Sequence, residues 1–164
     1  MEKLFISLFG GIGGFDLAFI KNGWKCAGYY EIDKYCTQVY NKNFNTIYSP
    51  TDIREISADS IPDHNLLCAG FPCQAFSIAG KRRGFQDTRG TLFFEIARIL
   101  KAKRPSYFLL ENVKGLLNHN KGETFSVILQ TLSELGYDVQ SMVLNSKFFG
   151  VPQNRERVFI IGNL

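Results

Sequence analysis

Two residues in this chain of 164 stand out for the chemistry they could carry, and the first is Cys73. It lies in the stretch GFPCQAFS, directly after a proline and just past the apolar run LLCAGF. A thiol is mostly protonated at neutral pH unless nearby positive charge lowers its pKa. Such charge follows in the sequence as Lys81, Arg82, Arg83 and Arg89. Cys73 is therefore a candidate nucleophile, whereas Cys68, inside the apolar run, is expected to fill the core.

The second residue is Glu111, near the end of the apolar run SYFLLENV. A carboxyl group partly buried at the end of a strand tends to have a raised pKa and can hold a proton. A hydrolase would pair the thiol with a histidine base, but neither His64 nor His119 offers a convincing partner. A thiolate and a proton-holding carboxyl group instead suit addition to a ring whose nitrogen must take up electron density.

A third feature is the glycine-rich stretch FGGIGG at 9–14, which permits a tight turn and close approach of the backbone to a ligand. Its spacing is not the GxGxxG of dinucleotide-binding proteins. Glu31 follows the second apolar run, where an acidic residue would bind ribose hydroxyls, and Asp52 could accept from an adenine amino group. Together they predict a nucleoside pocket. The alternatives are a glycine turn without a ligand and, for Asp52, a loop or cap residue after a short extended segment.

These candidates need a fold that brings them to one edge. The hydrophobic pattern predicts strands at 3–9, 25–32, 66–71, 106–113, 137–146 and 156–164. It predicts helices at 13–23, 33–44, 90–105 and 122–137, the second capped by Asp33. The alternation indicates an α/β sandwich with a mostly parallel sheet. Right-handed crossovers then place the strand-to-helix loops, and with them the candidates, on one ligand-binding edge.

The composition, with 45% hydrophobic and 21% charged residues, is that of one globular domain. Residues 71–164 carry thirteen Lys and Arg against seven Asp and Glu, which favours a polyanionic partner or a basic face in solvent. Four cysteines without a CxxC pair, and two histidines, argue against a metal site and favour reduced thiols in a cytoplasmic protein. The apolar start lacks a signal cleavage site, and no run is long enough to span a membrane.

Taken in order, these stretches resemble the cytosine carbon-5 DNA methyltransferases, the modification enzymes of restriction systems. The segments that carry the resemblance are SLFGGIGGFD, YYEIDKY, TDI, GFPCQAFSIAG, RGTLFFEIARI, ENVKG and QNRERVF, which run along nearly the whole chain. PCQ, ENV and QxRxR in this order are highly specific. The resemblance implies a Rossmann-like class I S-adenosylmethionine-dependent methyltransferase fold. In that fold a mostly parallel, twisted sheet has an antiparallel strand near the C-terminus and helices on both faces.

The resemblance also implies a cofactor, S-adenosylmethionine. Phe9 would lie against its adenine, Glu31 would bind its ribose hydroxyls, and Asp52 would lie near the adenine amino group. Gly11 and Gly13 would allow the backbone to approach it. The remaining cofactor contacts implied by the family are Ile32, Ile53, Pro72 and Leu92.

In the chemistry implied by the resemblance, Cys73 would attack carbon 6 of a cytosine flipped out of double-stranded DNA. Glu111 would hold ring nitrogen 3 and the exocyclic amine. Asn112 would brace the loop bearing Cys73, Arg157 would contact the base or orient Glu111, and Arg155 would brace similarly or reach a phosphate. The residues implied to meet the DNA are Phe71, Gln74, Ser77, Lys81 and Asn112, with water contact as an equal alternative for Ser77.

The family normally continues past this point with a target-recognition domain and two further motifs. We therefore expect residues 1–164 to form an incomplete catalytic and cofactor-binding domain, completed by a second polypeptide or a C-terminal segment. An exposed apolar patch should mark where a helix of the last motif packs, and cofactor binding by this chain alone should be weak. The alternatives are a tRNA cytosine-5 methyltransferase and a non-catalytic DNA- or partner-binding fragment. A nicotinamide dehydrogenase fails on the glycine spacing.

Overall fold

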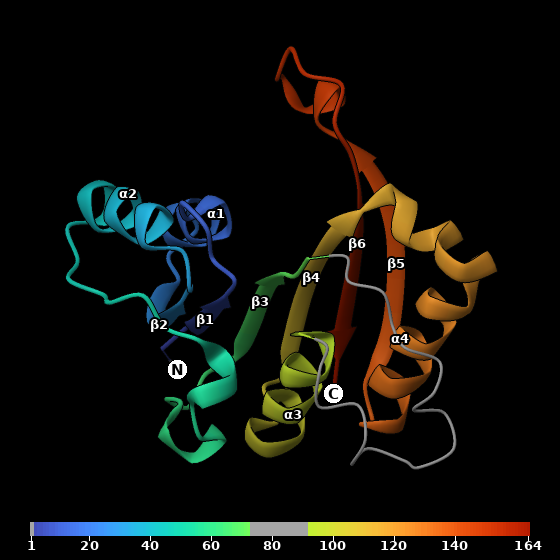
Figure 1. Cartoon of the computed structure of the whole chain (residues 1–164), viewed down its shortest axis with the longest axis horizontal. Coiled ribbons are helices and arrows are strands. Elements are labelled where there is room, and N and C mark those ends of the chain that lie inside the picture. The colour runs from blue at the N-terminus through green and yellow to red at the C-terminus, as the bar shows by residue number, and fades with distance from the viewer. Residues whose placement is uncertain (1, 73–91) are drawn as a thin grey trace.

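The computed structural model describes residues 2–72 and 92–164, which form a six-stranded sheet flanked by helices (Figure 1). Each strand lies where an apolar run predicted it. The strands are β1 (Leu4–Leu8), β2 (Lys25–Tyr30), β3 (Leu66–Gly70), β4 (Tyr107–Val113), β5 (Asp138–Asn145) and β6 (Glu156–Asn163).

The order of strands across the sheet is β2-β1-β3-β4-β6-β5. The pairs β1–β2, β1–β3 and β3–β4 are parallel, whereas β6 runs antiparallel to both of its neighbours, β4 and β5. This confirms a mostly parallel sheet with one antiparallel strand near the C-terminus. Because of that reversal, the first residues of β6 lie beside the last residues of β4 and meet the strand-to-helix loops at one edge.

The main helices are α1 (Gly14–Lys21), α2 (Lys34–Phe44), α3 (Leu92–Lys103) and α4 (Glu123–Glu134), each within a range predicted to be helical. Asp33 caps α2 as expected, because its carboxylate accepts from the backbone amides of Tyr35 and Cys36. The remaining short 3₁₀ segments in the described ranges are η1 (Ile53–Glu55), η2 (Ala58–Ser60), η5 (Lys114–Gly122) and η6 (Ser146–Phe149).

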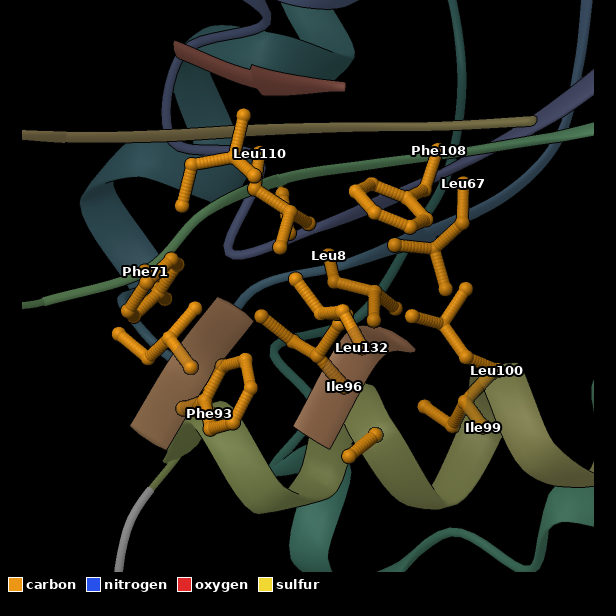
Figure 2. Packing of buried hydrophobic residues seen from close by; sticks show 14 of the residues in the cluster. Leu8, Leu67, Phe71, Phe93, Ile96, Ile99, Leu100, Phe108, Leu110 and Leu132 are labelled. Carbon is orange, nitrogen blue, oxygen red and sulfur yellow. The ribbon is translucent and has the colours of Figure 1, made fainter. Parts of the chain in front are cut away.

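Side chains alternate between the two faces of the sheet, and each face forms a separate core with the helices that cover it. The larger core joins strand residues to α3 and α4; Figure 2 shows part of it, labelled at Leu8, Leu67, Phe71, Phe93, Ile96, Ile99, Leu100, Phe108, Leu110 and Leu132. The smaller core holds Phe5, Leu66 and Cys68 against Phe15, Phe19 and Trp24 of the α1 side. Cys68 is fully buried, as expected for a core residue.

The α1 side of the sheet also holds an apolar hollow beyond the smaller core. A cavity of about 460 Å³ is lined there by residues of α1, β3, β4, β5 and β6, among them Tyr107, Leu109 and Ile161, and by Trp24, which lies between α1 and β2. Tyr107 is 52% exposed and Ile161 is 48% exposed, although both lie on central strands. An apolar surface of this kind on a central sheet is typical of a face that another element covers.

The segment before Asp52 belongs to none of the six strands, and 46–52 connects α2 to η1 without helix or strand. It is held against the end of β2 by one backbone hydrogen bond, from the Thr51 amide to the Glu31 carbonyl at 2.7 Å. That bond brings Asp52 beside Glu31 without a strand.

Candidate functional site

The glycine turn between β1 and α1 faces the end of β2. Gly11 has a φ of +54°, a conformation that costs little only for glycine, and an added Cβ would meet no atom within 4 Å. Its amide donates to Glu31 Oε2 at 2.9 Å. The other oxygen of Glu31 accepts from the Asp33 amide at 2.9 Å. The turn and the carboxylate are thus fixed to each other, and open space lies beside Gly11.

Gly13 has a packing role in addition to the predicted one. It is the N-cap of α1 with a φ of +91°, and a Cβ there would lie 2.3 Å from the Phe44 ring and 2.9 Å from Tyr40. Both aromatic rings belong to α2. The absence of a side chain at Gly13 therefore permits α1 and α2 to pack together, and Gly13 does not line the cavity described next.

A cavity of about 300 Å³ opens beside the turn, within the size range of small-molecule sites. It contains six residues that the sequence assigned to a cofactor. These are Phe9, Glu31, Ile32, Asp52, Ile53 and Leu92. Of the other three assigned residues, Gly11 and Gly13 lie in the turn, and Pro72 is exposed outside the cavity lining. Aromatic, apolar and carboxylate groups around one hollow match what a nucleoside needs.

The structure adds Tyr30, Thr51 and Arg54 to the lining, which the sequence did not identify. Arg54 matters most, because its guanidinium binds the Asp52 carboxylate at 2.5 Å. Asp52 also caps η1 by accepting from the Arg54 amide, so the cap alternative was correct. Hydrogen bonding from Arg54 lowers the pKa of Asp52, which keeps this carboxylate ionised. An acidic cap followed two residues later by arginine was the available signal.

The wall formed by η1 is held from behind by α3. Arg98 donates to the carbonyls of Ile53 and Ile56 at 3.1 and 3.0 Å. Glu95, one turn earlier on the same helix, binds the Arg98 guanidinium at 2.8 Å. The two bonds from Arg98 to η1 and its end join residues more than forty positions apart in sequence and fix the backbone at Ile53.

A second polar group lies at the same edge, where β3 and β4 end. Glu111 is in register with Gly70, the last residue of β3, and a Cβ at Gly70 would lie 3.5 Å from a Glu111 carboxylate oxygen. The Arg157 guanidinium lies 2.8 Å from the other oxygen, and both side chains are 22% exposed. Arg157 pairs with Val113 in the β4–β6 ladder, so it is a diagonal neighbour of Glu111 on one face.

Asn112 and Phe71 face the opposite way from Glu111. Asn112 is 2% exposed, and its amide donates to the Phe71 carbonyl at 2.9 Å. The Phe71 ring is 4% exposed and packs against Phe93, with ring centroids 5.9 Å apart. We expected both residues to meet DNA, but in this structure both side chains are buried. Asn112 does brace the backbone one step before Pro72, at the start of the segment leading to Cys73.

Four predicted residues, Cys73, Gln74, Ser77 and Lys81, lie outside the described residues. Arg155 is exposed, just before β6. Its backbone closes the connection between β5 and β6, since its amide donates to Asn145 Oδ1 at 3.2 Å and its carbonyl accepts from the Ser146 amide at 3.1 Å.

The thiols that the structure describes are poor nucleophiles. Burial raises the pKa of Cys26 to about 11 and also raises the pKa of Cys36 and of Cys68. All three are therefore protonated at neutral pH.

Within residues 2–72 and 92–164, no group of three or more His, Cys, Asp and Glu side chains could hold a metal ion. Nor is any helix there long and apolar enough to cross a membrane.

Comparison with known proteins gives a consistent result. The family model for the C-5 cytosine-specific DNA methylases matches residues 4–164. The Type II methyltransferase M.NgoBI of Neisseria gonorrhoeae is 56% identical over 158 residues, which are 96% of this chain and 49% of that protein. The Type II methyltransferase M.HaeII of Haemophilus aegyptius is 56% identical over 160 residues, 97% of this chain and 50% of that protein. This chain thus spans about half the length of these curated relatives.

Solved methyltransferase structures share this fold. The S. pombe Dnmt2 methyltransferase superposes with a TM-score of 0.80 over 99% of this chain and 51% of its own, at 24% identity. At that identity the likeness shows the fold alone. It confirms the Rossmann-like methyltransferase architecture that the family resemblance implied.

Proposed function

Because this chain belongs to the C-5 cytosine-specific DNA methylase family, we propose that it is the catalytic and cofactor-binding half of a DNA (cytosine-5) methyltransferase of a restriction-modification system. The observation that carries the proposal is the position of Glu111. Its carboxylate lies beside Gly70, three residues before Cys73, and at the same sheet edge as the nucleoside-sized cavity.

The family uses S-adenosylmethionine, and the residues of the cavity fit it. Phe9 offers an aromatic surface for adenine, and the fixed Glu31 carboxylate has lone pairs left for ribose hydroxyls. Asp52 would accept from the adenine amino group only if it shares its carboxylate with Arg54. The bound cofactor supplies an electrophilic methyl group. In our proposal the cavity residues orient that group toward the Glu111 edge and exclude water.

The proposed reaction begins with a cytosine flipped out of duplex DNA, since its carbon 5 is otherwise inaccessible. The Cys73 thiolate forms a bond to carbon 6, and the ring electrons move toward nitrogen 3, where Glu111 holds a proton. Carbon 5 becomes nucleophilic and would take the methyl group as the bond between that group and the cofactor sulfur breaks, leaving S-adenosylhomocysteine. Loss of the carbon 5 proton to water, cleavage of the bond between the cysteine sulfur and carbon 6, and return of the nitrogen 3 proton to Glu111 would then restore the aromatic ring and the Cys73 thiolate.

Arg157 is proposed to orient Glu111 during these steps. Its guanidinium already lies 2.8 Å from one carboxylate oxygen, which supports this role over a direct contact with the base. The other oxygen faces Gly70 and would be the one presented to the pyrimidine. Asn112 holds the carbonyl that precedes Pro72 and so fixes the start of the Cys73 segment from the opposite face.

We further propose that the rest of the enzyme covers the apolar hollow on the α1 side. The exposed rings and side chains of that hollow, together with the half-length match to the relatives, support a second polypeptide or a further C-terminal segment that carries the target-recognition domain. Double-stranded DNA would then bind between this chain and that domain.

The test uses the chain combined with the carboxyl-terminal half of the Neisseria gonorrhoeae relative. Duplex DNA containing 5-fluorocytosine should trap a covalent protein–DNA adduct in the presence of S-adenosylmethionine. Carbon 5 then carries fluorine in place of the hydrogen that must leave as a proton, so the adduct cannot resolve. Cys73→Ala should abolish the adduct, and Glu111→Gln should reduce it by at least tenfold while the protein stays folded.

Other outcomes discriminate the alternatives. Methyl transfer to tRNA but not to duplex DNA would replace the DNA proposal by the tRNA one. No adduct with either nucleic acid, from a complex shown to have assembled, would indicate a non-catalytic fragment.

A further inference from the structure

We propose that Tyr29 is a positioning residue for the cofactor cavity, acting through Gly11 on Glu31; this inference rests on the proposed function. Tyr29 is absent from the lining of the cavity and is 2% exposed. Its hydroxyl nevertheless donates to the Gly11 carbonyl at 2.6 Å. The amide of the same glycine donates to Glu31, so Gly11 is held on both sides.

These two bonds matter because Gly11, as a glycine, has no side chain that restricts its rotation. Glycine populates positive and negative φ about equally, so the φ of +54° at Gly11 must be fixed by contacts with other residues. The Tyr29 hydroxyl fixes the peptide that follows Gly11, and the Glu31 carboxylate fixes the peptide that precedes it. Without the tyrosine bond, the turn could rotate and the amide would leave Glu31.

The Tyr29 ring is itself fixed in place. A Cβ at Gly10 would lie 2.6 Å from Tyr29 Cε2, so the ring packs directly on the turn. Tyr29 also stacks on Tyr40, with ring centroids 3.7 Å apart and an interplanar angle of 23°. The ring therefore cannot swing away, and its hydroxyl stays on the Gly11 carbonyl.

Tyr40 is in turn anchored to a buried carboxylate that the proposed chemistry does not use. Its hydroxyl donates to Asp16 Oδ1 at 2.8 Å, and Ser7 donates to Asp16 Oδ2 at 2.8 Å. Asp16 is completely buried between β1, α1 and α2. Contacts thus run from this carboxylate through two stacked tyrosines to the turn, and from the turn to the group proposed to hold the ribose.

The experiment compares Tyr29→Phe with Tyr137→Phe. Tyr137 is a matched control, because it is 3% exposed and its hydroxyl donates to the Pro105 carbonyl at 2.9 Å, far from the cavity. Each variant loses one buried hydroxyl and keeps its ring. Binding of S-adenosylmethionine to the chain is measured by calorimetry, and exchange of the Gly11 amide proton by NMR.

Tyr29→Phe should raise the dissociation constant roughly fivefold, the value of one neutral hydrogen bond of about average strength. It should also accelerate Gly11 amide exchange, while Tyr137→Phe changes neither. In the assembled enzyme the KM for the cofactor should rise with kcat unchanged. Equal affinity and exchange in the two variants, with normal binding by the wild type, would overturn the role of Tyr29 alone. No cofactor binding by wild-type chain or assembled enzyme would overturn the proposed function as well.

Discussion

Replacing Gly13 by alanine tests whether this glycine is needed for the packing of α1 against α2, whereas Gly11 lies beside the cavity. A residue with a side chain pays about 1–2 kcal/mol to adopt a left-handed conformation such as the φ of +91° at this position. The new Cβ would also lie 2.3 Å from the Phe44 ring, which must move within a packed interface. Such overpacking costs roughly 1–3 kcal/mol. The total loss of unfolding free energy is therefore roughly 2–5 kcal/mol.

Gly11→Ala is the matched control, since it has a positive φ but no atom within 4 Å of the added Cβ. It should lose only the conformational contribution, about 1–2 kcal/mol. For a domain of this size each kcal/mol shifts the Tm by about 2–4 °C. Thermal unfolding followed by circular dichroism should therefore place Gly13→Ala at least about 2 °C below Gly11→Ala.

Cofactor affinity should show the opposite order, because the Gly11 Cβ would enter the open space beside the cavity. Titration calorimetry of S-adenosylmethionine should find weaker binding for Gly11→Ala than for Gly13→Ala at a temperature where both are folded. A Gly13→Ala protein as stable as Gly11→Ala would refute the packing role assigned to Gly13.

Three further substitutions test other contacts. Asn112→Ala leaves the Phe71 carbonyl without its donor and should cost about 1–3 kcal/mol in urea unfolding; no loss would exclude bracing by Asn112. Burial raises the pKa of Asp16 above its ordinary value of 3.8. Wild type should therefore lose stability relative to Asp16→Asn as pH rises from about 4 through the folded-state pKa, and a difference independent of pH would contradict this. Arg98→Met frees the Ile53 carbonyl and should weaken cofactor binding several-fold in calorimetry; unchanged affinity would show that η1 holds itself.

The sequence predicted the strands, helices and mostly parallel sheet because each element has a clear hydrophobic period. It also predicted most of the cavity lining, since loops after parallel strands meet at one edge. Two side-chain directions were missed although the signal existed. Alternation along β3 assigns Phe71 to the same face as Leu67, and alternation along β4 separates Asn112 from Glu111. Residue parity thus predicts burial for Phe71 and Asn112.

Other features depend on contacts that sequence reading does not supply. The bond from Tyr29 to Gly11 and the two bonds from Arg98 require the folded positions of distant segments. The role of Gly13 likewise depends on how closely α2 approaches α1, which the glycine pattern alone does not specify. The position of β6 between β4 and β5 cannot be predicted from the hydrophobic runs, because these locate the strands without giving their order in the sheet.

The reversed direction of β6 makes the Glu111–Arg157 pair sensitive to errors of register but indifferent to loop length. A slip of one residue along β4 would turn Arg157 to the other face, because side chains alternate. The connection from 146 to 155 projects beyond the sheet edge (Figure 1), so extra residues there extend into solvent without shifting the ladder. Lengthening this hairpin tip should therefore be tolerated, whereas deleting a single residue between Arg157 and Phe159 should separate guanidinium from carboxylate.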